Sequence, residues 1–196
     1  YEVGYGMTQV AIGDNLLIRP WIETLVRLNN SFIVKRGVSV RQMLEVSGTL
    51  SAYINKTIKE TGESVWIAQR EGRAKDSNDR TQPSLLKMLA MAGGNVPVSI
   101  SYEYDPCDYL KAKEFQQKRD DPNYHKTQRD DLLNMETGIL SYKGRVHFTI
   151  AGPINDAIKS LDPTMDRNEL FASVAAIIDK EIYKNYRFYP GNYVAY

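Results

Sequence analysis

The feature that most constrains the fold is a strand–helix–strand pattern in the first third of the chain. Ser31–Gly37 begins with an apolar run and ends in two cations and a glycine, and Ser64–Ile67 is a second apolar run, which predicts a buried strand. Between them, Ser39 and Gln42 form a capping-box pattern, and apolar residues then recur at helical spacing. A helical crossover between two strands of one sheet makes the strands parallel. The pattern therefore predicts that both strands end at the same edge of a sheet.

The rest of the chain continues this alternation of strands and helices. Further strands are predicted at Thr8–Gly13, Val96–Glu103 and Arg145–Ile150, and further helices at Pro20–Leu28, Pro83–Ala92 and Asp166–Ile182. Residues 107 to 140 are polar and have a helical tendency. Such alternation is typical of an α/β fold, here with a mixed, largely parallel sheet that carries helices on both faces. The length suits a single domain spanning residues 1–196.

Composition argues against several classes of function. The 25 basic and 24 acidic side chains give a net charge of +1, which provides no overall attraction to nucleic acid. Cys107 is the single cysteine, so we expect no intrachain disulfide, no zinc site and a reducing, cytoplasmic location. No apolar run approaches the roughly 20 residues of a membrane-spanning helix. Neither GxxxxGKS/T nor GxGxxG occurs, which argues against nucleotide enzymes of those types.

A polar loop of thirteen residues, Ala68–Arg80, follows the second of the two strands and precedes a helix that begins near Pro83. The loop carries four cations and a glycine, namely Arg70, Arg73, Lys75, Arg80 and Gly72. In open α/β sheets, ligands bind in the crevice beyond the carboxyl ends of the strands. The loop is therefore either an anion-binding site or a solvated turn with interspersed charge, and both interpretations are open at this point.

Three stretches of the chain form an ordered set. Phe32–Arg36 is a Phe-Ile strand that ends in two cations, Glu71–Arg73 is a Glu-Gly pair followed by an arginine, and Val96–Glu103 is an apolar strand with an early proline. Together they resemble the second, third and fourth sequence blocks of the glycerolipid acyltransferase superfamily, which includes glycerol-3-phosphate and 1-acylglycerol-3-phosphate acyltransferases. The resemblance covers roughly residues 8 to 105. It implies a fold like that of glycerol-3-phosphate acyltransferase.

The resemblance also implies a site for the phosphate of the acceptor substrate. Its residues are expected to be Lys35, Arg36, Glu71, Gly72, Arg73 and Lys75. The chain departs from the family pattern in both blocks: Asn29 replaces a glycine, and Lys35 stands where an arginine is expected. The third block lacks one residue, so either Arg73 or Lys75 takes the basic position. Because arginine offers a phosphate a planar fork and lysine a point charge, the assignment is to the whole cluster.

The family's catalytic block is a histidine and an aspartate with four residues between them, lying before the second block. The histidine takes the proton of the acceptor hydroxyl, a role that suits its pKa. His125 and Asp130 have this spacing, but they follow the fourth block, and residues five apart do not share a helix face. His147 lies on a predicted strand, where a packed or surface position is expected. We therefore expect no catalytic residue in this chain and place the pair before Tyr1, in an N-terminal part of the domain.

The resemblance implies transfer of a fatty acyl group, with acyl-CoA or acyl carrier protein as donor and no further cofactor. The acceptor is a hydroxyl of glycerol-3-phosphate or 1-acylglycerol-3-phosphate in phospholipid synthesis. Lipid substrates imply peripheral contact with the inner face of a membrane. The alternative is a non-catalytic α/β domain that binds an anionic phospholipid headgroup.

Aromatic residues at the C-terminus allow two interpretations. Five tyrosines lie there: Tyr183, Tyr186, Tyr189, Tyr193 and Tyr196. Tyrosine is favoured at membrane interfaces because its ring is apolar and its hydroxyl is hydrated. A terminal segment that packs its rings on the domain surface is the simpler interpretation and is the one we favour. Trp21 and Trp66 lie in apolar patterns and are predicted to be core residues.

Overall fold

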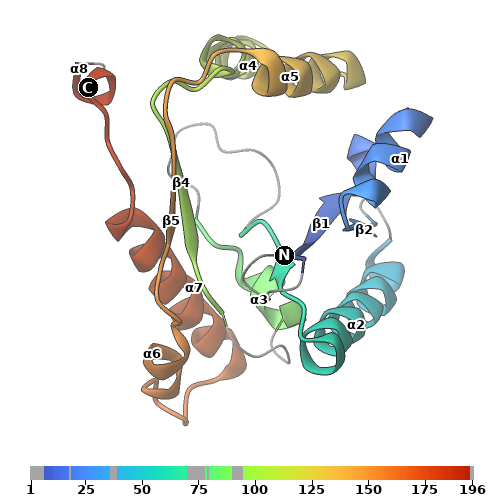
Figure 1. Cartoon of the computed structure of the whole chain (residues 1–196), viewed down its shortest axis with the longest axis vertical. Coiled ribbons are helices and arrows are strands. Elements are labelled where there is room, and N and C mark those ends of the chain that lie inside the picture. The colour runs from blue at the N-terminus through green and yellow to red at the C-terminus, as the bar shows by residue number, and fades with distance from the viewer. Residues whose placement is uncertain are drawn as a thin grey trace. The chain divides into compact units, whose positions relative to one another are not determined.

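The computed structural model in Figure 1 describes residues 7–17, 19–35, 39–69, 78, 80–89 and 95–194. Contacts within the chain group it into two compact units. The first unit contains strands β1 to β3, helices α1 to α3, α6 and the beginning of α7. The second unit contains β4, β5, α4, α5, the end of α7 and α8. The single domain over residues 1–196 stays a prediction.

The first unit is built on a three-stranded parallel sheet. Its strands are β1 (Gln9–Gly13), β2 (Ser31–Val34) and β3 (Val65–Trp66), in the order β2-β1-β3. The central strand β1 pairs in parallel with both neighbours. The predicted parallel orientation of β2 and β3 is thus confirmed, although β1 lies between them. This order is also the beginning of one common doubly wound sheet.

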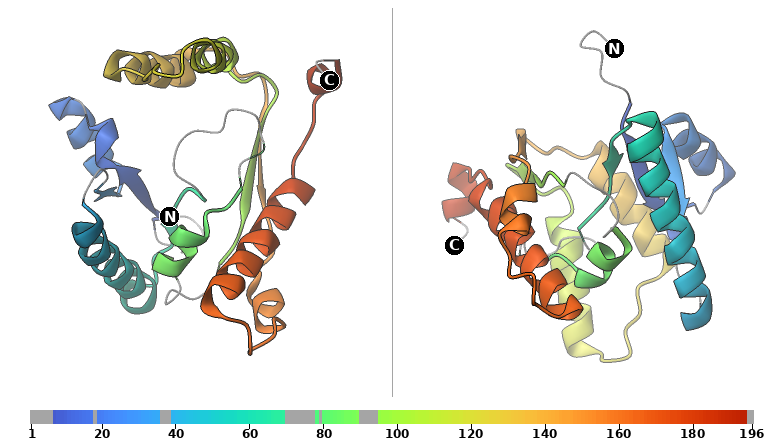
Figure 2. Two further views of the ribbon diagram at one scale, coloured as in Figure 1. Left: turned by 180° about the vertical axis from the view of Figure 1, so that it is seen from behind. Right: turned by 90° about the horizontal axis from the view of Figure 1, so that it is seen from below.

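Two helices flank this sheet. α1 (Pro20–Leu28) and α2 (Val40–Lys56) lie on opposite sides of it in Figures 1 and 2. α1 connects β1 to β2 on one side, and α2 connects β2 to β3 on the other side of β1. Because both connections are right-handed but run in opposite directions along the sheet, the two helices lie on opposite faces. A short 3-10 turn (Asp14–Leu16) follows β1. Helices on both faces are therefore confirmed for this unit.

The start of α2 follows the sequence prediction closely. The Ser39 hydroxyl oxygen accepts a hydrogen bond from the backbone N–H of Gln42 at 3.4 Å. In return, the Gln42 side-chain oxygen accepts from the backbone N–H of Ser39 at 3.2 Å. This is the predicted capping box. The helix passes into a π-helical turn (Thr57–Thr61) and stops at Gly62, whose φ of 68° favours glycine.

The core of the first unit lies along α2. Leu50 and Ile54 of α2 are buried, as is Leu86 of α3 (Pro83–Leu89), the helix that α2 contacts. Ile22 on α1 is also buried, and it anchors that helix. α6 (Asn155–Lys159) belongs to the same unit, as does the beginning of α7 (Arg167–Lys184). Two members of the apolar pattern that predicted this helix, Leu50 and Ile54, are therefore core residues.

The two tryptophans are not core residues, so that prediction was wrong. Trp21 is 64% exposed, and its neighbour Ile22 faces the interior instead. Trp66 is 38% exposed because β3 is a two-residue strand at the edge of the sheet. Val65, the other residue of β3, is only half-buried, so the run is not the buried strand that its apolar residues predicted.

The second unit contains a separate antiparallel pair of strands, β4 (Val98–Tyr102) and β5 (Val146–Ile150). The chain between them forms α4 (Asp108–Asp120) and α5 (Gln128–Leu140). Tyr102 at the end of β4 pairs with Val146 at the start of β5. α4 and α5 therefore leave and rejoin the strand pair at the same end. The single, largely parallel sheet of the prediction is therefore corrected to two small sheets of different type.

Polar residues hold the C-terminal segment to β4. The Ser99 hydroxyl donates to the carbonyl oxygen of Ile182 at 2.7 Å, and the Ser101 hydroxyl oxygen accepts from the backbone N–H of Arg187 at 2.9 Å. The end of α7 accordingly lies against β4 in Figure 2. α8 (Pro190–Val194) follows, and Tyr189 just before it is 3% exposed. Packing of the terminal rings is confirmed for this tyrosine, whereas Tyr193 is 71% exposed.

Replacing Gly144 with alanine is expected to destabilise the second unit by about 1–3 kcal/mol. Gly144 has a φ of 62°, and a methyl group there would lie 2.7 Å from a Glu103 carboxylate oxygen and 2.8 Å from the Tyr104 ring. Urea denaturation measures the change, and Gly152→Ala is the control because a methyl group at Gly152 meets nothing within 4 Å. Equal effects of the two substitutions would contradict the prediction.

Candidate functional site

Lys35 is the one residue of the predicted phosphate cluster that the described ranges include. Arg36, Glu71, Gly72, Arg73 and Lys75 lie outside the described residues. Lys35 directly follows β2 and is exposed. The convergence of the cluster on one phosphate therefore stays a prediction.

The ends of β2 and β3 point to the same edge of the sheet, as the sequence predicted. The register places Val34 opposite Gly13, and Trp66 opposite Val10, so β2 continues three residues beyond β3. At about 3.3 Å per residue and about 4.8 Å between strands, the two ends are offset by roughly 10 Å along the strands and roughly 10 Å across them.

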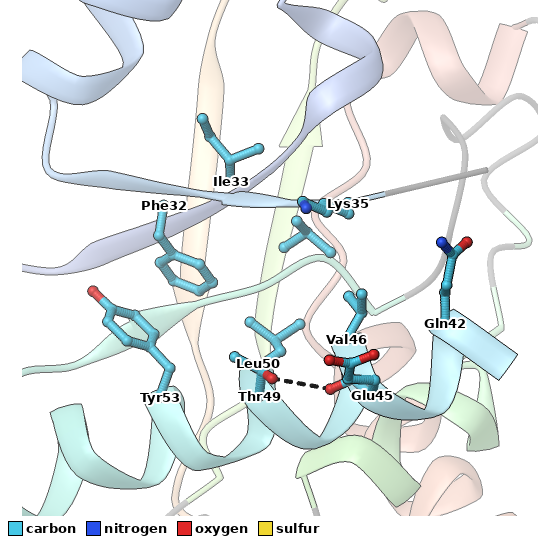
Figure 3. Close-up of a pocket in the computed structure, with 10 residues that line it drawn as sticks. Phe32, Ile33, Lys35, Gln42, Glu45, Val46, Thr49, Leu50 and Tyr53 are labelled. Atoms are coloured by element: carbon cyan, nitrogen blue, oxygen red, sulfur yellow. Dashed lines mark hydrogen bonds between the residues drawn. The ribbon is translucent and has the colours of Figure 1, made fainter. Parts of the chain in front are cut away.

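A cavity of about 490 Å³ lies beside Lys35, between β2 and α2. Figure 3 shows the side chains that line it. They are Phe32, Ile33, Val34, Lys35, Gln42, Glu45, Val46, Thr49, Leu50 and Tyr53. We call this cavity the β2–α2 groove.

The two ends of the β2–α2 groove differ in polarity. Lys35, Gln42 and Glu45 lie near its one end, where β2 finishes and α2 begins, and Phe32 with Tyr53 lies at the other (Figure 3). In the described part of the chain, no carboxylate forms an ion pair with Lys35. Within the described residues the Lys35 ammonium therefore has no carboxylate partner, and apolar side chains extend from this end along the groove.

A short hydrogen-bond chain fixes the apolar end of the groove. The Tyr53 hydroxyl donates to the Gln9 side-chain oxygen at 2.6 Å, and the amide nitrogen of Gln9 donates to Glu63. The Phe32 and Tyr53 rings lie with their centroids 5.1 Å apart and their planes tilted by 56°. Because both ends of the Gln9 amide are engaged, the Tyr53 ring has a defined position.

The start of α2 does not by itself form an anion site. A helix N-terminus attracts anions through its unpaired backbone N–H groups. Here the Ser39 hydroxyl oxygen already accepts from the Gln42 N–H, and the Gln42 side chain occupies the Ser39 N–H. Among the described side chains that line this end of the groove, the positive charge therefore comes from Lys35.

The helix-face argument against His125 and Asp130 was wrong, because His125 is exposed in the loop between α4 and α5 and does not lie in a helix. Asp130 caps α5 by accepting hydrogen bonds from the Thr127 N–H at 2.9 Å and the Thr127 hydroxyl at 2.6 Å. His147 is half-buried on β5, between the exposed side chains of Val146 and Phe148. Neither histidine belongs to the unit that contains the β2–α2 groove.

Two carboxylates of the second unit make its stability sensitive to acid. The side-chain and then the backbone hydrogen bonds of Arg145 lower the pKa of Glu103, and those of Thr127 lower the pKa of Asp130. A carboxylate whose pKa is lower in the folded than in the unfolded state stabilises the fold at every pH above its unfolded-state pKa. This stability is lost as the pH falls through the folded-state pKa, because the carboxylate is then protonated in both states. We expect urea midpoints to fall over that acidic range, and to fall less in Glu103→Gln. An unchanged acid response in the variant would contradict the assignment to Glu103.

Among the described residues, no group of three or more histidine, cysteine, aspartate or glutamate side chains is placed to hold a metal ion. Of the helices that the structure describes, none is long and apolar enough to cross a membrane. Comparison with family models, curated proteins and solved structures gave no match.

Sequence reasoning missed the part of the site that α2 contributes. It described this helix only by its capping box and by the helical spacing of its apolar residues. The groove residues Gln42, Val46, Thr49 and Tyr53 recur at intervals of three or four, which places them along a second stripe of the helix. That spacing was the available signal. The arrangement as a whole can bind a molecule that carries an anionic group next to an apolar segment.

Proposed function

We propose that the protein transfers a fatty acyl group from an acyl thioester to a hydroxyl of glycerol-3-phosphate or 1-acylglycerol-3-phosphate. The observation that carries this proposal is the position of Lys35. It stands where the second block of the resembling family has its phosphate-binding arginine. It lines the polar end of the β2–α2 groove, and no carboxylate of the described residues pairs with its ammonium. A charged hydrogen bond to phosphate is stronger than a neutral one, and it would orient the acceptor.

In this reaction the acceptor hydroxyl oxygen attacks the thioester carbonyl carbon and forms an ester. The carbon–sulfur bond breaks, and the donor leaves as a free thiol. The hydroxyl proton passes to a general base, which we propose to be the histidine expected before Tyr1. We do not assign this role to His125, because the carboxylate of Asp130, which would have to orient it, accepts the hydrogen bonds of Thr127 as a helix cap. Lipid substrates place the proposed enzyme at the cytoplasmic face of a membrane as a peripheral protein.

The test measures thiol release from acyl-CoA and from acyl carrier protein by the full-length protein, with each of the two acceptors. Thiol release that requires a glycerol phosphate, together with formation of the ester, supports the proposal. Binding of a glycerol phosphate without thiol release would favour the non-catalytic headgroup-binding domain instead.

Residues 1–196 alone are expected to bind a glycerol phosphate without turnover, because the proposed base is not among them. Isothermal titration with glycerol-3-phosphate measures binding, and the same thiol assay measures turnover. Activity of this polypeptide would show that the base was placed wrongly, and it would bring His125 back into consideration.

A further inference from the structure

We propose that β5 pairs with the β5 of a second copy of this chain, across a two-fold axis at Phe148, and that the two copies thereby form a four-stranded antiparallel sheet. The partner is a second copy because the outer edge of β5 is complementary to itself in hydrogen bonds, side chains and charge. The inference is independent of the proposed function, since neither Lys35 nor the β2–α2 groove takes part in the contact.

The outer edge of β5 has backbone groups that a further strand could bind. β4 and β5 lie side by side in Figure 1 and pair without a bulge. The ladder between them uses odd-numbered residues, as the Ala151 N–H shows by donating to the Pro97 carbonyl oxygen at 2.9 Å. Because alternate residues of an antiparallel strand bond to opposite sides, the N–H and C=O groups of Val146, Phe148 and Ile150 point away from β4. In the part of the chain that the structure describes, nothing bonds to them.

The same three side chains form an exposed apolar row. Val146 is 38% exposed, Phe148 58% and Ile150 74%. Proteins usually protect an edge strand with charged residues, proline or a bulge. β5 has no such protection, because its sequence is Val-His-Phe-Thr-Ile and its pairing with β4 is regular. An open and apolar edge of this kind is a template for pairing with another chain.

The outer edge of β4 is a poorer template than that of β5. The side chains of Val98 and Ile100, whose backbone groups point outward there, are already half-buried. Pro97 directly precedes the strand, and proline is one of the residues that protect sheet edges because it lacks an N–H group. We therefore assign the contact to β5.

A two-fold axis at Phe148 satisfies all the outward groups of β5 at once. It places Phe148 opposite its own copy and Val146 opposite Ile150 of the second copy. Each opposed pair can then exchange two backbone hydrogen bonds, because both residues direct their N–H and C=O groups at the other strand. Opposed side chains lie on the same face of a sheet, so apolar residues meet apolar ones. On the other face, His147 lies opposite Thr149.

Charge does not oppose a contact between two identical strands here. β5 contains no acidic residue, lysine or arginine. Arg145, just before it, is neutralised within its own copy: its Nε and Nη2 atoms each donate to a carboxylate oxygen of Glu103 at 3.0 Å. Its guanidinium also lies 4.9 Å from the centroid of the Tyr189 ring. Two copies can therefore approach along β5 without repulsion between like charges.

The size of the contact determines the expected affinity. Stable protein–protein interfaces bury about 1,200–2,000 Å². A pairing of two five-residue strands falls below that range. We therefore expect a reversible dimer with a dissociation constant in the micromolar range or weaker.

Sedimentation velocity of the full-length protein, from low to high micromolar concentration, measures the dimer. Phe148→Lys and Phe148→Glu are each expected to weaken it about tenfold or more, because like charges then lie opposite each other in place of two rings. An equimolar mixture of the two variants should restore the dimer, because lysine then faces glutamate. Recovery in the mixture also shows that both variants are folded.

Leu140→Lys is the matched control, because Leu140 is 75% exposed in the same unit but lies on α5. It should dimerise like the unchanged protein. A protein that is monomeric at every concentration would overturn the proposal. So would a Phe148→Lys dimer as stable as that of Leu140→Lys, or a mixture no more dimeric than either variant alone.

Disulfide formation tests the position of the axis. Opposed residues that exchange hydrogen bonds have Cα atoms about 5.5 Å apart, within the range of about 4.4–6.8 Å that a disulfide spans. Phe148→Cys should therefore give a cross-linked dimer under mild oxidation, and the native Cys107 does not compete because it is buried. In Val146→Cys, the two cysteines would be separated by four residues of extended chain, about 13 Å, which is too far. Cross-linking of neither variant, or of both equally, would overturn the proposed pairing.

Discussion

Replacing Ile54 with alanine is expected to lower the free energy of unfolding by about 2–5 kcal/mol. Ile54 is 1% exposed and lies on the face of α2 that carries the core of the first unit. The substitution removes buried hydrocarbon and leaves a cavity that the surrounding helices fill only in part. Alanine has the higher helix propensity, but that gain is at most about 0.7 kcal/mol. The cavity effect therefore dominates.

Equilibrium unfolding in urea measures this loss, with the slope of the transition as a check that the same surface unfolds. The control is Leu28→Ala, because Leu28 lies in α1 of the same unit and is 77% exposed. A surface substitution of this kind should change stability by less than about 0.5 kcal/mol. If Ile54→Ala and Leu28→Ala have equal effects, α2 does not carry the core that the structure shows.

Replacing Lys35 with alanine is expected to raise the KM for the acceptor about tenfold to a hundredfold. A hydrogen bond to a charged group contributes about 1.5–3 kcal/mol, and this variant removes one from the phosphate. Because Lys35 is exposed in the free protein, folding stability should remain unchanged. The KM for the thioester should also remain unchanged, since the donor does not use this cation in the proposed reaction.

Two further variants make the Lys35 prediction specific. Lys35→Arg restores the residue that the resembling family has at this position, and its guanidinium can hold a phosphate in two hydrogen bonds. It should keep the acceptor KM or lower it. Lys56→Ala is the matched control, because Lys56 is an exposed lysine at the end of α2 outside the groove. If Lys35→Ala keeps the normal acceptor KM, the phosphate is bound elsewhere.

Local features of the fold followed from the sequence alone. The capping box of Ser39 and Gln42 and the start of α1 at Pro20 were predicted, because each depends on residues within one helical turn. The parallel orientation of β2 and β3 was also predicted, since a helical crossover of that length permits little else. Lys35 was predicted as a candidate phosphate-binding residue through its position at the end of an apolar strand.

The tertiary structure alone decided how distant segments combine. It placed β1 between β2 and β3, and it paired β4 with β5 in a separate antiparallel sheet. A strand pattern specifies which faces are apolar, but the partner of a strand is chosen by contacts between residues far apart in the sequence. The burial of Ile22 in place of Trp21 had the same origin. So did the β2–α2 groove, because the tertiary structure brings Tyr53 next to Phe32 and Gln9, which lie far from it in the sequence.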